Sequence, residues 1–139
     1  MNLVRLIYAS EMTQPMSMPA LVGLLEKARP NNARLGLTGM LTFGNGQFLQ
    51  ALEGSPVAVN RLYARLLRDP RHVNAMLLAY GPVNSRAFGR WAMGFHRWGE
   101  GVGSGPEDFH PMDMDPPAAL ELLLELSARI PAGQGGPAA

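Results

Sequence analysis

The chain has 139 residues, a net charge of +1 at neutral pH and no cysteine. This length suits a single domain with its own hydrophobic core, and the lack of cysteine excludes disulfides, thiol catalysis and thiolate metal sites. The near-neutral charge predicts neither a nucleic-acid partner nor a membrane partner, and no apolar run reaches the length of a membrane span, so we expect a cytoplasmic protein.

The first elements predicted along the chain are a strand and a helix. Residues 3–8 predict a strand with apolar side chains on both faces. Residues 17–29 carry leucines at helical spacing, with Ser17 as the capping residue. Pro30 is expected to end this helix, which places Asn31-Asn32 in a polar loop.

A hairpin and a second helix follow. Residues 37–43 and 46–54 predict two strands joined at Gly44-Asn45-Gly46, because an Asn-Gly pair between alternating apolar residues is a strong hairpin signal. Residues 55–69 begin with Ser-Pro and predict a helix that ends at Asp69-Pro70.

The remaining residues predict two further strands, a linker and a last helix. The strands cover residues 76–80 and 91–98. Residues 99–117 are rich in Gly, Pro and Asp and are expected to be a linker. Residues 118–130 predict the C-terminal helix, and residues 131–139 a disordered tail.

The element order β-α-β-β-α-β-β predicts an α+β fold of the ferredoxin-like type for residues 1–98. Two helices would cover one face of a five-stranded mixed sheet. The C-terminal helix would cover the other face, because Leu3, Ile7, Leu49 and Ala51 would otherwise form an exposed apolar patch there.

One polar residue is out of place in this predicted core. Gln50 shares a strand face with Phe48 and Leu52, so its amide should be buried, and a buried amide without a partner costs about 1–3 kcal/mol. Tyr8 could donate its hydroxyl to the Gln50 carbonyl, but the amide NH₂ would still need an acceptor. A tyrosine–glutamine pair that only satisfies itself in the core is the commoner arrangement in proteins, and this alternative stays open.

Other polar residues also have ordinary structural interpretations. Arg65 and Asp69 are spaced as a surface ion pair on a helix, and Arg71-His72 as favourable charge at a helix end. His96 and His110 stand alone, which argues against a metal site.

The polar groups nevertheless converge on one place in the predicted fold. The loop after the first helix, the third strand and the second helix can line one pocket, and we expect Trp91 and Met93 on the same sheet face as Tyr8 and Gln50. Apolar walls with amides at the edge suit a planar heterocycle with carbonyls and ring nitrogens.

Five motifs in this order resemble the BLUF domain, a blue-light sensor that uses FAD, over residues 2–98. They are Leu6-Ile7-Tyr8-Ala9-Ser10; Asn31-Asn32; Gly36-Leu37-Thr38-Gly39-Met40-Leu41 with Phe48-Leu49-Gln50-Ala51-Leu52-Glu53-Gly54; Asp69-Pro70-Arg71-His72; and Trp91-Ala92-Met93. Two departures are Ala28, where a small polar residue is common in the family, and Met40, which replaces a branched aliphatic residue.

The resemblance implies a flavin between the two helices: FAD, or else FMN or riboflavin. Asn32 and Asn31 would bind the pyrimidine edge, and Arg65 and Asp69 the other polar edge or the ribityl chain. Gln50 would bridge Tyr8 and the flavin. The implied cofactor-binding residues are Tyr8, Leu24, Asn31, Asn32, Phe48, Gln50, Arg65 and Asp69, and the implied photoactive residues are Tyr8, Gln50, Trp91 and Met93.

The resulting prediction is a photoreceptor and not an enzyme. Too few residues follow Trp98 for an effector domain, so the signal would leave through self-association, as a homo-oligomer, or through a separate protein effector. Two alternatives remain, an RNA-recognition-like module and a small enzyme of the same fold without a cofactor. The first needs exposed aromatic side chains and basic flanks, and the second needs a nucleophile–base pair.

Overall fold

The computed structural model describes residues 2–14, 16–98 and 105–130. Its elements are β1 (Val4–Met12), α1 (Met18–Arg34), β2 (Thr38–Gly44), β3 (Gln47–Gly54), α2 (Pro56–Leu67), β4 (His72–Pro82), β5 (Gly94–Arg97), the short 3₁₀ helix η1 (Pro111–Asp113) and α3 (Pro116–Ser127). No helix within these ranges is long and apolar enough to cross a bilayer.

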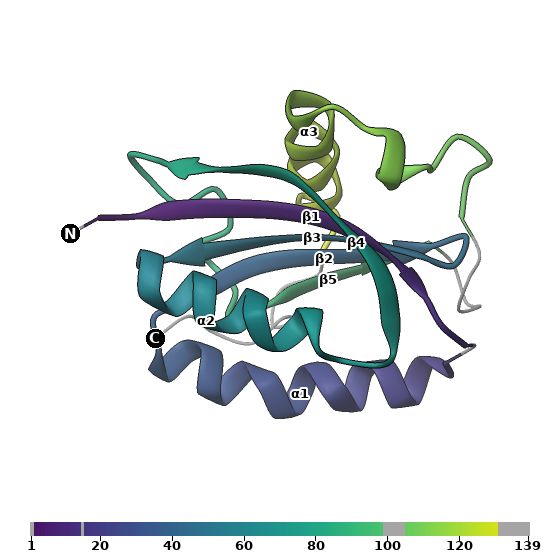
Figure 1. Ribbon diagram of the computed structural model, residues 1–139, viewed down its shortest axis with the longest axis horizontal. Coiled ribbons are helices and arrows are strands. Elements are labelled where there is room, and N and C mark those ends of the chain that lie inside the picture. The colour runs from purple at the N-terminus through teal and green to yellow at the C-terminus, as the bar shows by residue number, and fades with distance from the viewer. Residues whose placement is uncertain (1, 15, 99–104, 131–139) are drawn as a thin grey trace.

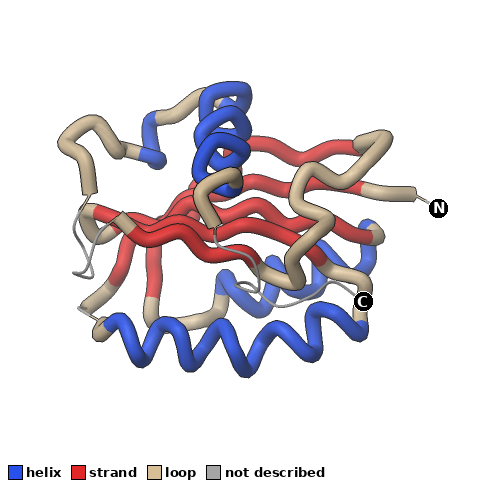
Figure 2. The backbone as a smooth tube through the Cα atoms, turned by 180° about the vertical axis from the view of Figure 1, so that it is seen from behind, coloured by secondary structure: helices blue, strands red, loops and turns tan. Residues whose placement is uncertain are grey.

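Five strands form one sheet in the order β4-β1-β3-β2-β5. All neighbouring pairs are antiparallel except β2 and β5, which are parallel. Helices α1 and α2 cover one face and α3 lies on the other, as the front view in Figure 1 and the rear view in Figure 2 both show. This is the ferredoxin-like fold that the sequence predicts, with the C-terminal helix on the expected face.

The Asn45-Gly46 turn sets the register between β2 and β3. Asn45 and Gly46 have φ values of 52° and 73°, as a two-residue hairpin turn with a right-handed strand twist requires. Strand β3 then pairs with β1 so that Tyr8 lies directly opposite Gln50. The pairing of β1 with β3 therefore brings together two side chains that are far apart in the sequence.

Strand alternation divides the buried residues into two cores. Val4, Leu6 and Tyr8 of β1 face α1 and α2. Ile7 and Ala9 face α3 instead. The α3-side core also includes Leu49, Ala51, Phe88, Trp91, Phe109, Leu123 and Leu126.

The prediction that Pro30 ends the first helix is wrong. Helix α1 continues through Pro30 to Arg34. It ends in a Schellman motif, in which Gly36 has a φ of 71° and the Leu37 N–H donates to the Asn32 carbonyl at 2.8 Å. This closure and the burial of Asn32 offset the free-energy cost of the backbone hydrogen bond that proline cannot donate. Asn32 therefore lies in the last turn of a helix and not in a loop.

The predicted strand at residues 91–98 is shorter than expected. Regular pairing begins only at Gly94, where β5 starts. Met93 belongs to the core on the α1 side and Trp91 to the core on the α3 side, so the prediction that they share a face is wrong. The physical reason is that α1 holds the backbone here: Arg29 Nε donates to the Met93 carbonyl at 3.0 Å and Asn32 Nδ2 to the Ala92 carbonyl at 3.3 Å.

The described part of the predicted linker is packed against the sheet. Phe109 and Pro111 are buried, and the Asn45 amide of the hairpin turn donates to the Pro106 carbonyl at 2.7 Å. Asp115 caps α3, which therefore begins at Pro116, two residues before the predicted start. Residues 99–104 and the predicted disordered tail lie outside the described residues.

Candidate cofactor-binding site

A cavity of about 410 Å³ lies between α1, α2 and the sheet. This volume is in the range of small-molecule binding sites. All eight residues that the sequence assigns to cofactor binding line it: Tyr8, Leu24, Asn31, Asn32, Phe48, Gln50, Arg65 and Asp69. Met93 lines it as well, whereas Trp91 does not.

The Gln50 amide connects two other buried side chains at the cavity wall. Tyr8 Oη donates to Gln50 Oε1 at 2.5 Å, and Gln50 Nε2 contacts Met93 Sδ at 3.4 Å. Tyr8 and Gln50 are only 3% and 7% exposed. Burial, followed by the nearby Tyr63 and Asp69, raises the pKa of the Tyr8 phenol well above its usual value, so the hydroxyl keeps its proton and acts as a donor.

The two ends of this amide are satisfied unequally. The oxygen accepts a short hydrogen bond from a phenol, whereas the nitrogen reaches only a thioether, which is a weak acceptor. Among the described residues, Met93 is the only acceptor that Nε2 reaches. The self-satisfied tyrosine–glutamine pair therefore accounts for the carbonyl end alone, and the NH₂ group can still bind an acceptor in the cavity.

Helix α1 contributes amides from its last turn. Asn32 is 3% exposed, lines the cavity, and uses Nδ2 to hold the Ala92 carbonyl. The side-chain oxygen Oδ1 of Asn31 accepts a hydrogen bond from the Arg34 guanidinium. Both asparagines thus occupy fixed positions on a rigid element, which suits recognition of a polar ring edge.

The predicted ion pair between Arg65 and Asp69 is wrong. Asp69 lies beyond the end of α2, so helical spacing does not apply to it, and its carboxylate binds Arg71 instead at 2.6 Å. Hydrogen bonds from Arg71 hold the pKa of the Asp69 carboxyl below its usual value. None of the ion pairs within the described ranges involves Arg65, so its guanidinium can bind a ligand in the cavity.

Sequence reasoning missed several residues that line the cavity. Lys27 is one of them, and because it lies three positions after Leu24 within the predicted helix, helical spacing alone could have identified it. Ala28, the departure noted in the sequence, also lines the cavity. His72 was interpreted only as a helix-end charge. It does contact the α2 carbonyl of Leu66, but its Nδ1 also lies 2.7 Å from Ser10 Oγ, and its ring borders the cavity.

Comparisons with known proteins agree on one family. The family described as "BLUF: Sensors of blue-light using FAD" matches residues 3–94. The solved ground state of BlsA is 28% identical, with a TM-score of 0.79, over 95% of this chain and 90% of that one. The dark-state structure of the BLUF protein BlrB is 27% identical, with a TM-score of 0.77, over 93% and 98% of the two chains.

A curated relative covers the same region of the sequence. The photoactivated adenylate cyclase subunit beta of Euglena longa is 38% identical over 87 residues, which is 63% of this chain and 10% of that protein. The chain therefore spans about a tenth of the length of the photoactivated adenylate cyclase subunits that it matches.

Proposed function

The chain belongs to the BLUF family of blue-light sensors that use FAD, and from that premise we propose how its residues hold the flavin and respond to light. The observation that carries the proposal is the hydrogen-bonded series Tyr8–Gln50–Met93, which is buried in the wall of the cavity. A glutamine amide in that position can present either a donor or an acceptor to a ring in the cavity.

The residues around the cavity fit a flavin. Its walls carry the apolar side chains of Leu24 and Phe48, which would pack against the ring. Asn32 and Asn31 would bind the pyrimidine edge. Arg65 and Asp69 would bind the remaining polar edge or the ribityl chain. When bound, the flavin supplies the absorption of blue light and the capacity to accept an electron. FMN and riboflavin carry the same ring system, so the same side chains would fit them.

The Gln50 amide is the element that would change state. Its two ends are nearly isosteric, so a half-turn exchanges Oε1 and Nε2 with little movement of the chain. Tyr8 Oη can donate to the carbonyl before the turn and accept from the NH₂ afterwards. Met93 Sδ can accept but not donate, so a carbonyl oxygen turned toward it is unfavourable, and Met93 must move.

Movement of Met93 would be transmitted to the opposite face of the sheet. Trp91 lies two positions earlier in the chain and packs in the α3-side core. The contact is tight, because a Cβ at Gly94 would lie 3.1 Å from Ile130 Cδ1 and 3.3 Å from the Trp91 ring. The segment 91–94 therefore joins the cavity to Ile130, three positions after the end of α3.

The output that we propose is a change in binding and not catalysis by this chain. Helix α3 and the segment before it form the surface at which a homo-oligomer or a separate protein effector would respond, in a protein of the cytoplasm. In a similar solved structure, a bacterial light-regulated adenylyl cyclase, the region matched by this chain is 34% of a longer protein. No observation favours the RNA-recognition alternative, because Phe48 faces the helix-covered core and α3 packs on the other face of the sheet.

A dark and light absorption spectrum tests the proposal. We expect the purified protein to be yellow and its flavin band to shift reversibly to the red under blue light. Tyr8→Phe and Gln50→Leu should each retain the flavin and lose the shift, whereas Tyr80→Phe, at an exposed tyrosine far from the cavity, should behave as wild type. A colourless protein that binds none of the three flavins, or a normal photocycle in either cavity variant, would contradict it.

A further inference from the structure

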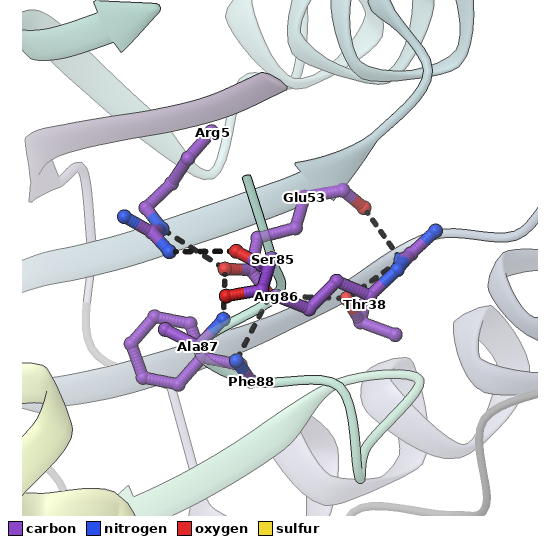
Figure 3. A network of polar contacts seen from close by, with 7 residues as sticks. All are labelled: Arg5, Thr38, Glu53, Ser85, Arg86, Ala87 and Phe88. Carbon is purple, nitrogen blue, oxygen red and sulfur yellow. Dashed lines mark hydrogen bonds and ion pairs between the residues drawn. The ribbon is translucent and has the colours of Figure 1, made fainter. Parts of the chain in front are cut away.

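Glu53 is a carboxylate sealed inside the protein, with no exposed surface. It lies on β3, three positions after Gln50, and points to the α3 side of the sheet. Figure 3 shows the donors that converge on it. Oε2 accepts from Arg5 Nε at 2.9 Å and from the Ala87 N–H at 2.7 Å, and Oε1 accepts from the Phe88 N–H at 2.9 Å and from Thr38 Oγ1 at 3.2 Å.

These contacts tie a loop to the sheet through its backbone. Two consecutive N–H groups, those of Ala87 and Phe88, each bind a different oxygen of Glu53, which fixes both the position and the direction of the chain there. Arg86 reinforces the attachment by donating to Thr38 Oγ1 at 2.8 Å. The ion pair with Arg5 balances the buried charge, so the carboxylate is fully partnered.

The same strand holds both ends of the segment 88–93. Glu53 binds its beginning at Phe88, and Gln50 contacts its end at Met93 Sδ. Phe88 lies in the α3-side core and Met93 in the core on the α1 side, so the segment passes from one face of the sheet to the other. The position of the thioether therefore depends on where Glu53 fixes the loop.

We propose that Glu53 is a positioning residue for the light response, because it fixes the segment that places Met93 against the Gln50 amide. This inference depends on the proposed role of Gln50. Return to the dark arrangement requires the amide to turn past Met93. A firmly anchored segment resists that turn, so the Glu53 contacts slow the thermal recovery.

Removing part of the anchor should therefore speed recovery. Glu53→Gln keeps the shape but removes the charge, and Thr38→Val keeps the shape but removes one of the four donors. We expect recovery at least about three-fold faster in the first and about two-fold faster in the second, at unchanged flavin loading and dark-state absorption. Thr38→Ser, which restores the hydroxyl, should recover at the wild-type rate. Glu11→Gln, at an exposed carboxylate on β1 that accepts a hydrogen bond from Asn74, is the matched control.

A second measurement separates positioning from general destabilisation. In a Met93→Leu background the thioether no longer contacts the amide, so Thr38→Val should change recovery by less than about 1.5-fold. Equal acceleration in both backgrounds would overturn the inference. So would unchanged or slower recovery in folded, flavin-loaded Thr38→Val, which decides the question if Glu53→Gln does not fold. A wild-type protein without a reversible shift would instead refute the proposed function.

Discussion

Removal of the Tyr8 hydroxyl should lower the free energy of unfolding, because it leaves the Gln50 amide oxygen without its partner. The hydroxyl donates to Gln50 Oε1 at 2.5 Å, and both side chains are buried. In Tyr8→Phe the amide oxygen loses this partner, for which the general cost is about 1–3 kcal/mol. The amide borders the cavity, where water can reach it in the flavin-free protein, so we expect the lower part of that range, about 1–2 kcal/mol.

The double variant makes this reasoning testable. Gln50→Leu should have a similar cost, because it leaves the Tyr8 hydroxyl as a buried donor without a partner. Tyr8→Phe combined with Gln50→Leu leaves neither group unpaired, so its cost should be smaller than the sum of the single costs by about 1 kcal/mol or more.

The assay is equilibrium unfolding of the flavin-free protein in urea, followed by tryptophan fluorescence, with Tyr80→Phe as the control that changes stability by less than about 0.5 kcal/mol. For a chain of this length, each single variant should lower the melting temperature by about 3–8 °C. Additivity of the two single costs within about 0.5 kcal/mol would refute the reasoning, because it would mean that the two side chains are not coupled.

Three further predictions follow from the same structure. Burial raises the pKa of the Tyr8 phenol above its value in the unfolded chain. The stability that the protonated phenol contributes is therefore complete below pH about 10 and falls by about 1.4 kcal/mol per pH unit as the pH rises further. Urea unfolding measured from pH 9 to 11 should show this fall in wild type and a smaller one in Tyr8→Phe. Gly39→Ala would place a Cβ 2.2 Å from the Ala51 carbonyl oxygen and should cost about 3 kcal/mol or more in the same urea assay, whereas Gly81→Ala, with open space around it, should cost less than about 1 kcal/mol. Asn32→Ala should weaken flavin binding about ten-fold in a fluorescence titration, because it removes a hydrogen bond to the flavin and the hydrogen bond that holds the Ala92 carbonyl before β5. Unchanged affinity would exclude Asn32 as a flavin ligand.

Local pattern was sufficient for most of the fold and for the central pair of the site. Alternation along β1 and β3 placed Tyr8 and Gln50 on one buried face, and the Asn45-Gly46 turn predicted the β2–β3 hairpin and its register. These features depend on residues close together in the sequence and on the fixed period of a strand, which explains why they could be predicted.

The errors concern the ends of the two helices α1 and α2, which the spacing of residue types did not fix. Pro30 was expected to end α1, but contacts of Asn32 with the chain before β5 and the closure at Gly36 keep the helix intact. Asp69 was assigned to Arg65 by helical spacing, but the helix ends before it and Arg71 takes the place of the predicted partner.

The sequence by itself determined the sandwich, its buried amide and the set of side chains around one cavity. Only the tertiary structure decided that Trp91 leaves the face it was expected to share with Met93 and packs in the α3-side core, and that Glu53 anchors the loop leading to both. Those arrangements depend on hydrogen bonds from α1 and β3 to a bend that has no regular period, and a pattern of residue types carries no information about such contacts.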